Sequence, residues 1–234
     1  MKKVVIVVFV LSLTAILGCR KKEVSNDFVK DTGKVAYMLP GFGEKVTDSV
    51  YLKLSRSFSD KGIEPRMIEV YNEEGIEKYT EDIIAEIRSY PNSPTDETYL
   101  FGISIGAVGA LNAISVIKPK VAIIASPAIF FEENRVAAKA MAWYTKEFIM
   151  SLMVHQDDAA LPELSQVIDD INKKSPYTEI IVMSGSNDMD MVKSNAVAVS
   201  NSIRGSTYIQ VPDAGDRLAD NAYLEAVLGI VESL

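Results

Sequence analysis

The sequence predicts an α/β fold, with a mostly parallel central sheet of about six strands and helices on both of its faces. Three observations lead to this prediction. Short apolar segments alternate with segments of helical spacing along most of the 234 residues. The apolar segments are hydrophobic over their whole length, which is typical of parallel strands that are buried on both faces. Glycine or proline bounds several of them, as expected for strands that end in tight loops.

The predicted elements follow one another in regular order. Six segments are predicted strands because they are short, apolar and flanked by turn residues: 34–39, 66–71, 98–101, 120–125, 179–183 and 207–211. Five segments are predicted helices because apolar residues recur every three to four positions: 49–61, 76–90, 107–117, 191–203 and 221–234. A helical insertion over about 130–174 separates the fourth and fifth strands. Residues 34–234 are therefore expected to form one domain.

Residues 1–19 are predicted to be a targeting signal. Lys2 and Lys3 precede an apolar stretch over 4–17, which is short for a spanning helix and suits a signal. The ending Ile-Leu-Gly-Cys resembles a bacterial lipobox, which implies cleavage before Cys19 and lipid attachment to it. Cys19 is also the only cysteine, whereas disulfides would need pairs. An uncleaved signal anchor is the alternative.

The polar residues 20–33 are predicted to tether the domain to the membrane. A lipid at Cys19 would place the domain in the cell envelope, facing the periplasm or the exterior. The formal net charge of −8 and the lack of a basic stripe argue against nucleic acid as a partner. The sequence has no cluster of His, Cys, Asp and Glu with zinc spacing and no EF-hand loop, so we expect neither a metal nor a cofactor.

The most informative motif is Gly-Ile-Ser-Ile-Gly at 102–106, between the third predicted strand and a helix. The pattern G-x-S-x-G at such a junction indicates a sharp turn with its serine in strained backbone. Glycine is needed on both sides because side chains there would collide with the strand and the helix. The turn lifts the Ser104 hydroxyl to a helix N-terminus, where N–H groups can stabilise an anion. Ser104 is therefore the candidate nucleophile.

With this motif on its third strand, the chain resembles the α/β-hydrolase family over nearly all of 34–234. In that family an oxyanion loop follows the first of these strands, which implies a role for Leu-Pro-Gly-Phe-Gly at 39–43. The resemblance implies that the N–H groups of Phe42 and Ile105 hold the oxyanion. An insertion after the fourth strand commonly forms a lid in this family, which implies a lid over 130–174.

The same resemblance assigns the acid but not the base. The family pattern, a glycine with an aspartate three residues on, selects Asp188 over Asp190 in the loop after the fifth strand. The base should be a histidine after Gly215, and this chain has Asp216 there. His155, the only histidine, lies in the insertion. An aspartate is a weak base at neutral pH unless a neighbouring charge raises its pKa.

Two functions follow from these residues. The first is a serine hydrolase acting on a small apolar ester or thioester, with Ser104, Asp188 and Asp216 in a non-standard triad. The alternative is a pseudo-hydrolase that lost its base and binds an apolar acyl ligand or an envelope partner.

Overall fold

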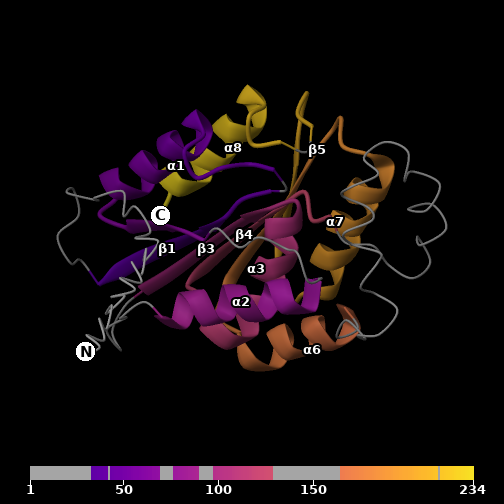
Figure 1. The fold of residues 1–234 in the computed structure, drawn as a ribbon. Coiled ribbons are helices and arrows are strands. Elements are labelled where there is room, and N and C mark those ends of the chain that lie inside the picture. The colour runs from indigo at the N-terminus through magenta and orange to yellow at the C-terminus, as the bar shows by residue number, and fades with distance from the viewer. Residues whose placement is uncertain (1–32, 42, 69–75, 90–96, 129–163, 216) are drawn as a thin grey trace, which may run out of the picture.

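The computed structural model describes residues 33–41, 43–68, 76–89, 97–128, 164–215 and 217–234. These residues form six strands and six helices (Figure 1). In chain order the elements are β1 (Lys34–Leu39), α1 (Ser49–Asp60), β2 (Glu64–Met67), α2 (Ile76–Ser89), β3 (Glu97–Ile103), α3 (Ile105–Ile117), β4 (Val121–Ala125), α6 (Leu164–Lys174), β5 (Glu179–Gly185), α7 (Asp190–Ser202), β6 (Thr207–Val211) and α8 (Asn221–Glu232). The predicted α/β class is confirmed.

The sheet is parallel throughout, with the strand order β2-β1-β3-β4-β5-β6. The chain runs from β1 outward to β2, returns to β3 on the other side of β1, and then proceeds to β6. The strand order therefore reverses between β1 and β3. In open α/β sheets, ligands bind beyond the carboxyl ends of the strands at such a switch point.

The predicted bounds were wrong at β2, which was expected over 66–71. The strand begins at Glu64 and ends at Met67, and it pairs with Val35–Met38 of β1. Pro65, within the observed strand, has no N–H to donate to a neighbouring strand. Since β2 is an edge strand, Pro65 is tolerated there. The helix expected from residue 107 also begins earlier, at Ile105, because the turn at Ser104 takes a single residue.

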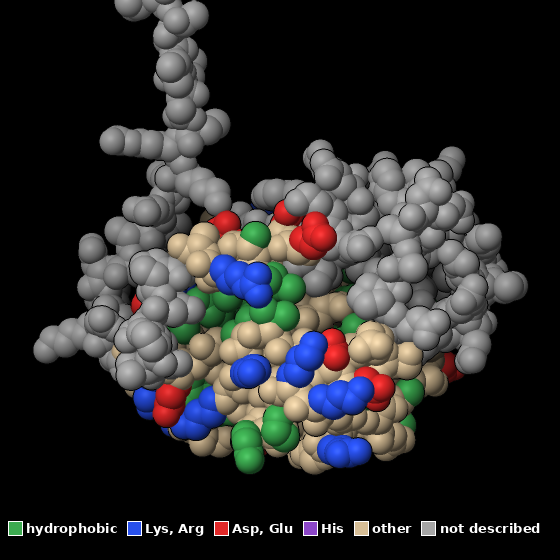
Figure 2. Space-filling model, turned by 90° about the horizontal axis from the view of Figure 1, so that it is seen from below, with side chains coloured by type: hydrophobic (Ala, Val, Ile, Leu, Met, Phe, Trp, Pro, Cys, Tyr) green, Lys and Arg blue, Asp and Glu red, His purple; other side chains and the backbone are tan. Residues whose placement is uncertain are grey.

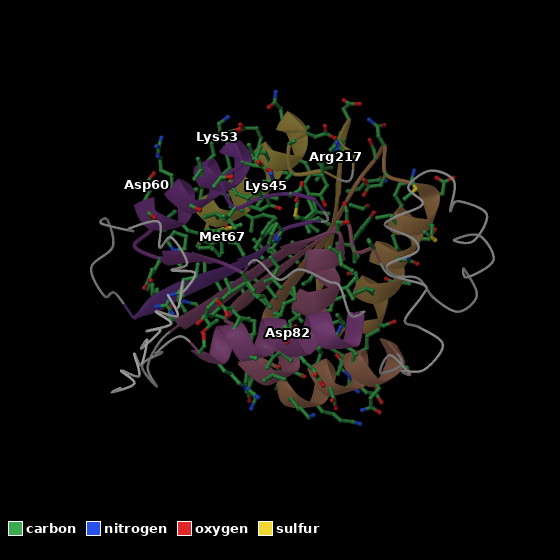
Figure 3. The ribbon with its side chains drawn as sticks, viewed as in Figure 1. Lys45, Lys53, Asp60, Met67, Asp82 and Arg217 are labelled. Carbon is green, nitrogen blue, oxygen red and sulfur yellow. The ribbon has the colours of Figure 1, made fainter. Side chains whose placement is uncertain are left out.

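Successive side chains of each strand point to opposite faces, and two hydrophobic clusters result. The cluster on one face joins the strands to α2, α3, α6 and α7, with Tyr37 and Leu100 at its centre. The other cluster joins them to α1 and α8, with Met38 and Phe101. Figure 1 shows these two helical layers on either side of the sheet. In Figure 3, Lys53 of α1 and Asp82 of α2 lie in opposite layers.

The last part of the predicted insertion belongs to one of these layers. Val167 and Ile171 of α6 are buried in the cluster that contains α3, so residues 164–174 cover the sheet. The lid predicted for 130–174 stays a prediction, because residues 130–163 lie outside the described part of the chain. Figure 2 shows the molecule from below, the side on which α2 and α6 lie in Figure 1, and charged side chains of both signs are scattered there among others. No helix among the described residues is long and apolar enough to cross a membrane.

Candidate active site

Ser104 occupies the turn between β3 and α3 with φ 55° and ψ −120°, a region that residues other than glycine rarely adopt. The side chain is partly exposed. A Cβ on Gly102 would lie 2.4 Å from the Gly106 carbonyl oxygen, and one on Gly106 would lie 2.2 Å from the Leu39 carbonyl oxygen. Both glycines are therefore required for the packing of α3 against β3 and β1. The structure thus contains the strained turn that the motif predicts.

Backbone hydrogen bonds hold Ser104 from two sides. Its N–H donates to the Ala125 carbonyl at 3.0 Å, and its own carbonyl accepts from Ala107 at 3.1 Å and from Ala128 at 3.3 Å. The neighbouring Ile105 is the first residue of α3, so its N–H has no acceptor within that helix. The predicted role of the Ile105 N–H as an oxyanion donor stays a prediction.

The loop after β1 lies against Ser104. A Cβ built on Gly41 would be 3.4 Å from the Ser104 Cβ. Gly41 N–H donates to Glu44 Oε2 at 2.8 Å and approaches the Tyr51 hydroxyl at 3.3 Å. The hydroxyl of Tyr51, a fully buried residue of α1, also donates to Glu44 Oε2. Phe42, the other predicted oxyanion donor, lies outside the described residues.

Sequence reasoning did not find Glu44 or Tyr51. A glutamate in a polar loop and a tyrosine on an amphipathic helix are both ordinary. The available signal was their position in the chain: Glu44 lies in the loop after β1 and Tyr51 in the first turn of α1, and the carboxyl end of β1 borders the switch point.

Asp188 is buried at the carboxyl edge of the sheet, in the loop after β5, with 5% of its surface exposed. Its Oδ2 accepts a hydrogen bond of 2.7 Å from the Ser126 hydroxyl and one of 2.8 Å from the Gly185 N–H. Ser126 Oγ also lies 2.9 Å from the hydroxyl of Tyr223 in α8. Asp190, in contrast, is almost fully exposed and pairs with Lys193 at 3.0 Å. Of these two aspartates, only Asp188 is buried and held by hydrogen bonds from neighbouring loops, and its role as the acid stays a prediction.

Ser126 and Tyr223 are further residues that the sequence did not indicate. Ser126 directly follows β4 and has φ 42°, so a second serine at this edge is held in left-handed backbone. It is 1% exposed, which makes it a support for Asp188 rather than a group that meets substrate.

The loop of Asp188 is docked on the segment that leads to position 216. Asn187 N–H donates to the Ala214 carbonyl and Ser186 N–H to the Val211 carbonyl, each at 2.8 Å. A Cβ on Gly185 would come within 2.1 Å of the Ala214 oxygen, so the two loops are in close backbone contact. Asp216 itself lies outside the described residues, as do Cys19 and His155. Within the described ranges, no group of three His, Cys, Asp or Glu residues could hold a metal ion.

The two buried tyrosines predict a loss of stability in alkali. Burial raises the pKa of Tyr51 and of Tyr223 above the usual value of 10.0, and the charges of Glu44 and Asp188 respectively raise each pKa further. Since the unfolded chain ionises its tyrosines near pH 10, this contribution to stability is complete below that pH and is lost above it. We expect the melting temperature to fall above about pH 10, with part of the tyrosinate absorbance at 295 nm appearing only on unfolding.

The variants Tyr51→Phe and Tyr223→Phe should each flatten this alkaline decline. Ionisation of all ten tyrosines with native circular dichroism retained would contradict the prediction.

We compared the chain with known protein families, protein sequences and solved structures. No family model and no curated protein sequence matches the chain. Among solved structures, Est1E from Butyrivibrio proteoclasticus is similar with a TM-score of 0.64 and 16% identity, over 86% of each chain. Est1E with bound ferulic acid gives a TM-score of 0.63 and 14% identity, over 86% of this chain and 87% of that one. FphF, a fluorophosphonate-binding serine hydrolase of Staphylococcus aureus, gives 0.60 and 14%, over 88% of this chain and 86% of that one. With these likenesses and the sheet order described above, the chain has the α/β-hydrolase fold.

Proposed function

We propose that the protein is a serine hydrolase that cleaves a small apolar ester or thioester through acylation of Ser104. The observation that carries this proposal is the backbone of Ser104, at φ 55° between β3 and α3. Strain of this kind costs about 1–3 kcal/mol and persists where the surrounding structure enforces it, often at a functional site. The two glycines and the bonds from Ala125 and Ala128 supply that enforcement here.

The roles follow the chemistry of acyl transfer. Ser104 attacks the carbonyl carbon, and the N–H groups of Ile105 and Phe42 stabilise the oxyanion. Asp188 and Asp216 belong to an altered proton relay in place of a standard triad. The ferulic acid bound to the similar Est1E supports a small acyl compound as the substrate.

The test is covalent labelling of the purified protein with a fluorophosphonate probe, which modifies activated serines. We expect one equivalent of probe, mapped to Ser104 by peptide mass spectrometry, and no labelling of Ser104→Ala or of heat-denatured protein. The same preparations should hydrolyse p-nitrophenyl acetate only when Ser104 is present. Equal hydrolysis by the native protein and Ser104→Ala would reject the proposal.

A pseudo-hydrolase is the second candidate, and two observations favour it. Asp216 stands where the fold's usual base is expected, and the Asp188 carboxylate accepts from Ser126 and Gly185. Such a protein would bind an apolar ligand or an envelope partner without turnover. A native fold with no labelling at Ser104 would select this candidate.

We also propose that the domain works at the cell envelope, held by lipid on Cys19. Support comes from the sequence alone: the basic start, the apolar stretch over 4–17 and the single cysteine that ends it.

A further inference from the structure

We infer that Glu44 is the general base that takes the proton of Ser104, in place of the histidine that this chain lacks at position 216. The inference rests on the proposed function, and it assigns the base of the same site. Glu44 lies in the loop between β1 and α1, whereas Ser104 follows β3. Since β1 and β3 are neighbours in the sheet, their carboxyl ends bring the two residues together.

The side chains of Glu44 and Ser104 both lie next to Gly41. A Cβ built on Gly41 would lie 2.8 Å from Glu44 Oε2, 3.3 Å from its carboxyl carbon and 3.4 Å from the Ser104 Cβ. The carboxylate and the serine side chain thus border one small volume, which stays open only because residue 41 has no side chain. The two side chains are therefore near enough for a proton to pass after a rotamer change of either residue or through one bridging water.

Two donors fix the carboxylate beside this volume. The Tyr51 hydroxyl donates to Oε2 from within the core, where Tyr51 packs among buried residues of α1 and α8. Gly41 N–H donates to the same oxygen at 2.8 Å. Glu44 itself is partly exposed, so it can exchange protons with solvent between turnovers. A base must be held in this way to act in each catalytic cycle.

Asp188 is less well placed for the same task. Asp188 follows β5, and Ser104 follows β3. Because β4 lies between these two strands, Asp188 is about two strand spacings, or roughly 10 Å, from Ser104. Glu44 follows β1, which is the direct neighbour of β3, so Asp188 is one strand spacing further from Ser104 than Glu44 is.

The reaction balances with these residues alone. Glu44 accepts the Ser104 proton as Oγ bonds to the ester carbonyl carbon, and the carbonyl electrons move onto its oxygen. When the oxyanion collapses, the bond to the alkoxy group breaks, and Glu44 returns the proton to the leaving alcohol. Water then attacks the acyl carbon, and Glu44 accepts its proton. When the second oxyanion collapses, the bond between the acyl carbon and Ser104 Oγ breaks, Glu44 returns the proton to Oγ, and the carboxylic acid leaves.

Glu44→Gln tests the inference, because the amide keeps an acceptor for Tyr51 and Gly41 but is not a base. Glu97→Gln is the matched control: Glu97 accepts from Tyr99 at 2.9 Å, but at the amino end of β3, far from Ser104. With p-nitrophenyl acetate, we expect Glu44→Gln to lower the acylation rate by about 10² to 10⁴, with KM nearly unchanged. Glu97→Gln should match the native protein, and Ser104→Ala should be inactive.

A second variant separates chemistry from structure. Glu44→Ala should also be inactive, and added formate should restore its acylation rate in proportion to the formate concentration, since formate supplies the missing carboxylate. The outcomes are distinct. If Ser104→Ala is inactive but Glu44→Gln stays within twofold of the native rate, the inference fails and the proposed function stands. If Ser104→Ala equals the native protein, the proposed function fails and takes the inference with it.

Discussion

Asp216→His should raise kcat/KM for p-nitrophenyl acetate by about 10² to 10⁴ at neutral pH, the usual contribution of a placed general base. Imidazole ionises near pH 6.5, close to the working pH, and so accepts a proton and releases it with similar ease. The segment before position 216 is docked on the Asp188 loop through Ala214 and Val211. A histidine at position 216 would therefore follow directly after a segment that is hydrogen-bonded to the loop of Asp188.

The measurement needs three comparisons. Asp216→Asn removes the carboxylate without adding a base, so it should show no such gain. Asp216→His with Ser104→Ala should be inactive, which ties the gain to the serine. Asp216→His with Glu44→Gln should keep most of the gain, because the imidazole then takes over the proton. No gain in Asp216→His, while fluorophosphonate still labels Ser104, would contradict the prediction that an imidazole at position 216 can act as a base for Ser104.

The sequence predicted those elements whose local pattern and position in the sheet agree. The segments 34–39 and 207–211 match β1 and β6 because each is a short run that can pair with a neighbouring strand and ends at a turn. The turn at Ser104 was predictable because only glycine fits on either side of it. The start of β2 was not, since Pro65 is acceptable only on an edge strand, and the strand order cannot be read from a local pattern.

The polar contacts around Ser104 could not be predicted, for a different physical reason. Ser126 and Tyr223 are 97 positions apart, and neither residue type has a periodicity that marks it as buried and paired. Their contact exists because the end of β4 lies next to the first turn of α8, which carries Tyr223. The Glu44–Tyr51 bond is closer in sequence, yet it depends on the path of a loop that contains two glycines. Such contacts follow from tertiary structure, and they fix the positions of the Asp188 and Glu44 carboxylates.

Among the residues that surround the turn at Ser104, Gly106 has very close backbone contacts. Its substitution by alanine is therefore expected to have the largest effect on stability. In Gly106→Ala the new Cβ would lie 2.2 Å from the Leu39 oxygen and 2.6 Å from the Pro40 oxygen. Both atoms are backbone, and Leu39 is the fully buried last residue of β1, so neither can move without displacing β1 from α3. We expect a loss of about 3 kcal/mol or more in the free energy of unfolding, measured by urea titration with circular dichroism.

Gly229→Ala is the matched control for that substitution. Gly229 lies within α8, and a Cβ there would have no atom within 4 Å. Alanine at this exposed helical position should stabilise the protein by about 0.5–1 kcal/mol, because glycine loses more backbone freedom on folding. The two variants make the same chemical change with opposite expected signs, so a general effect of added methyl groups cannot explain both. If Gly106→Ala were as stable as Gly229→Ala, α3 could not approach β1 as closely as it does here, and the strain assigned to Ser104 would lose its physical basis.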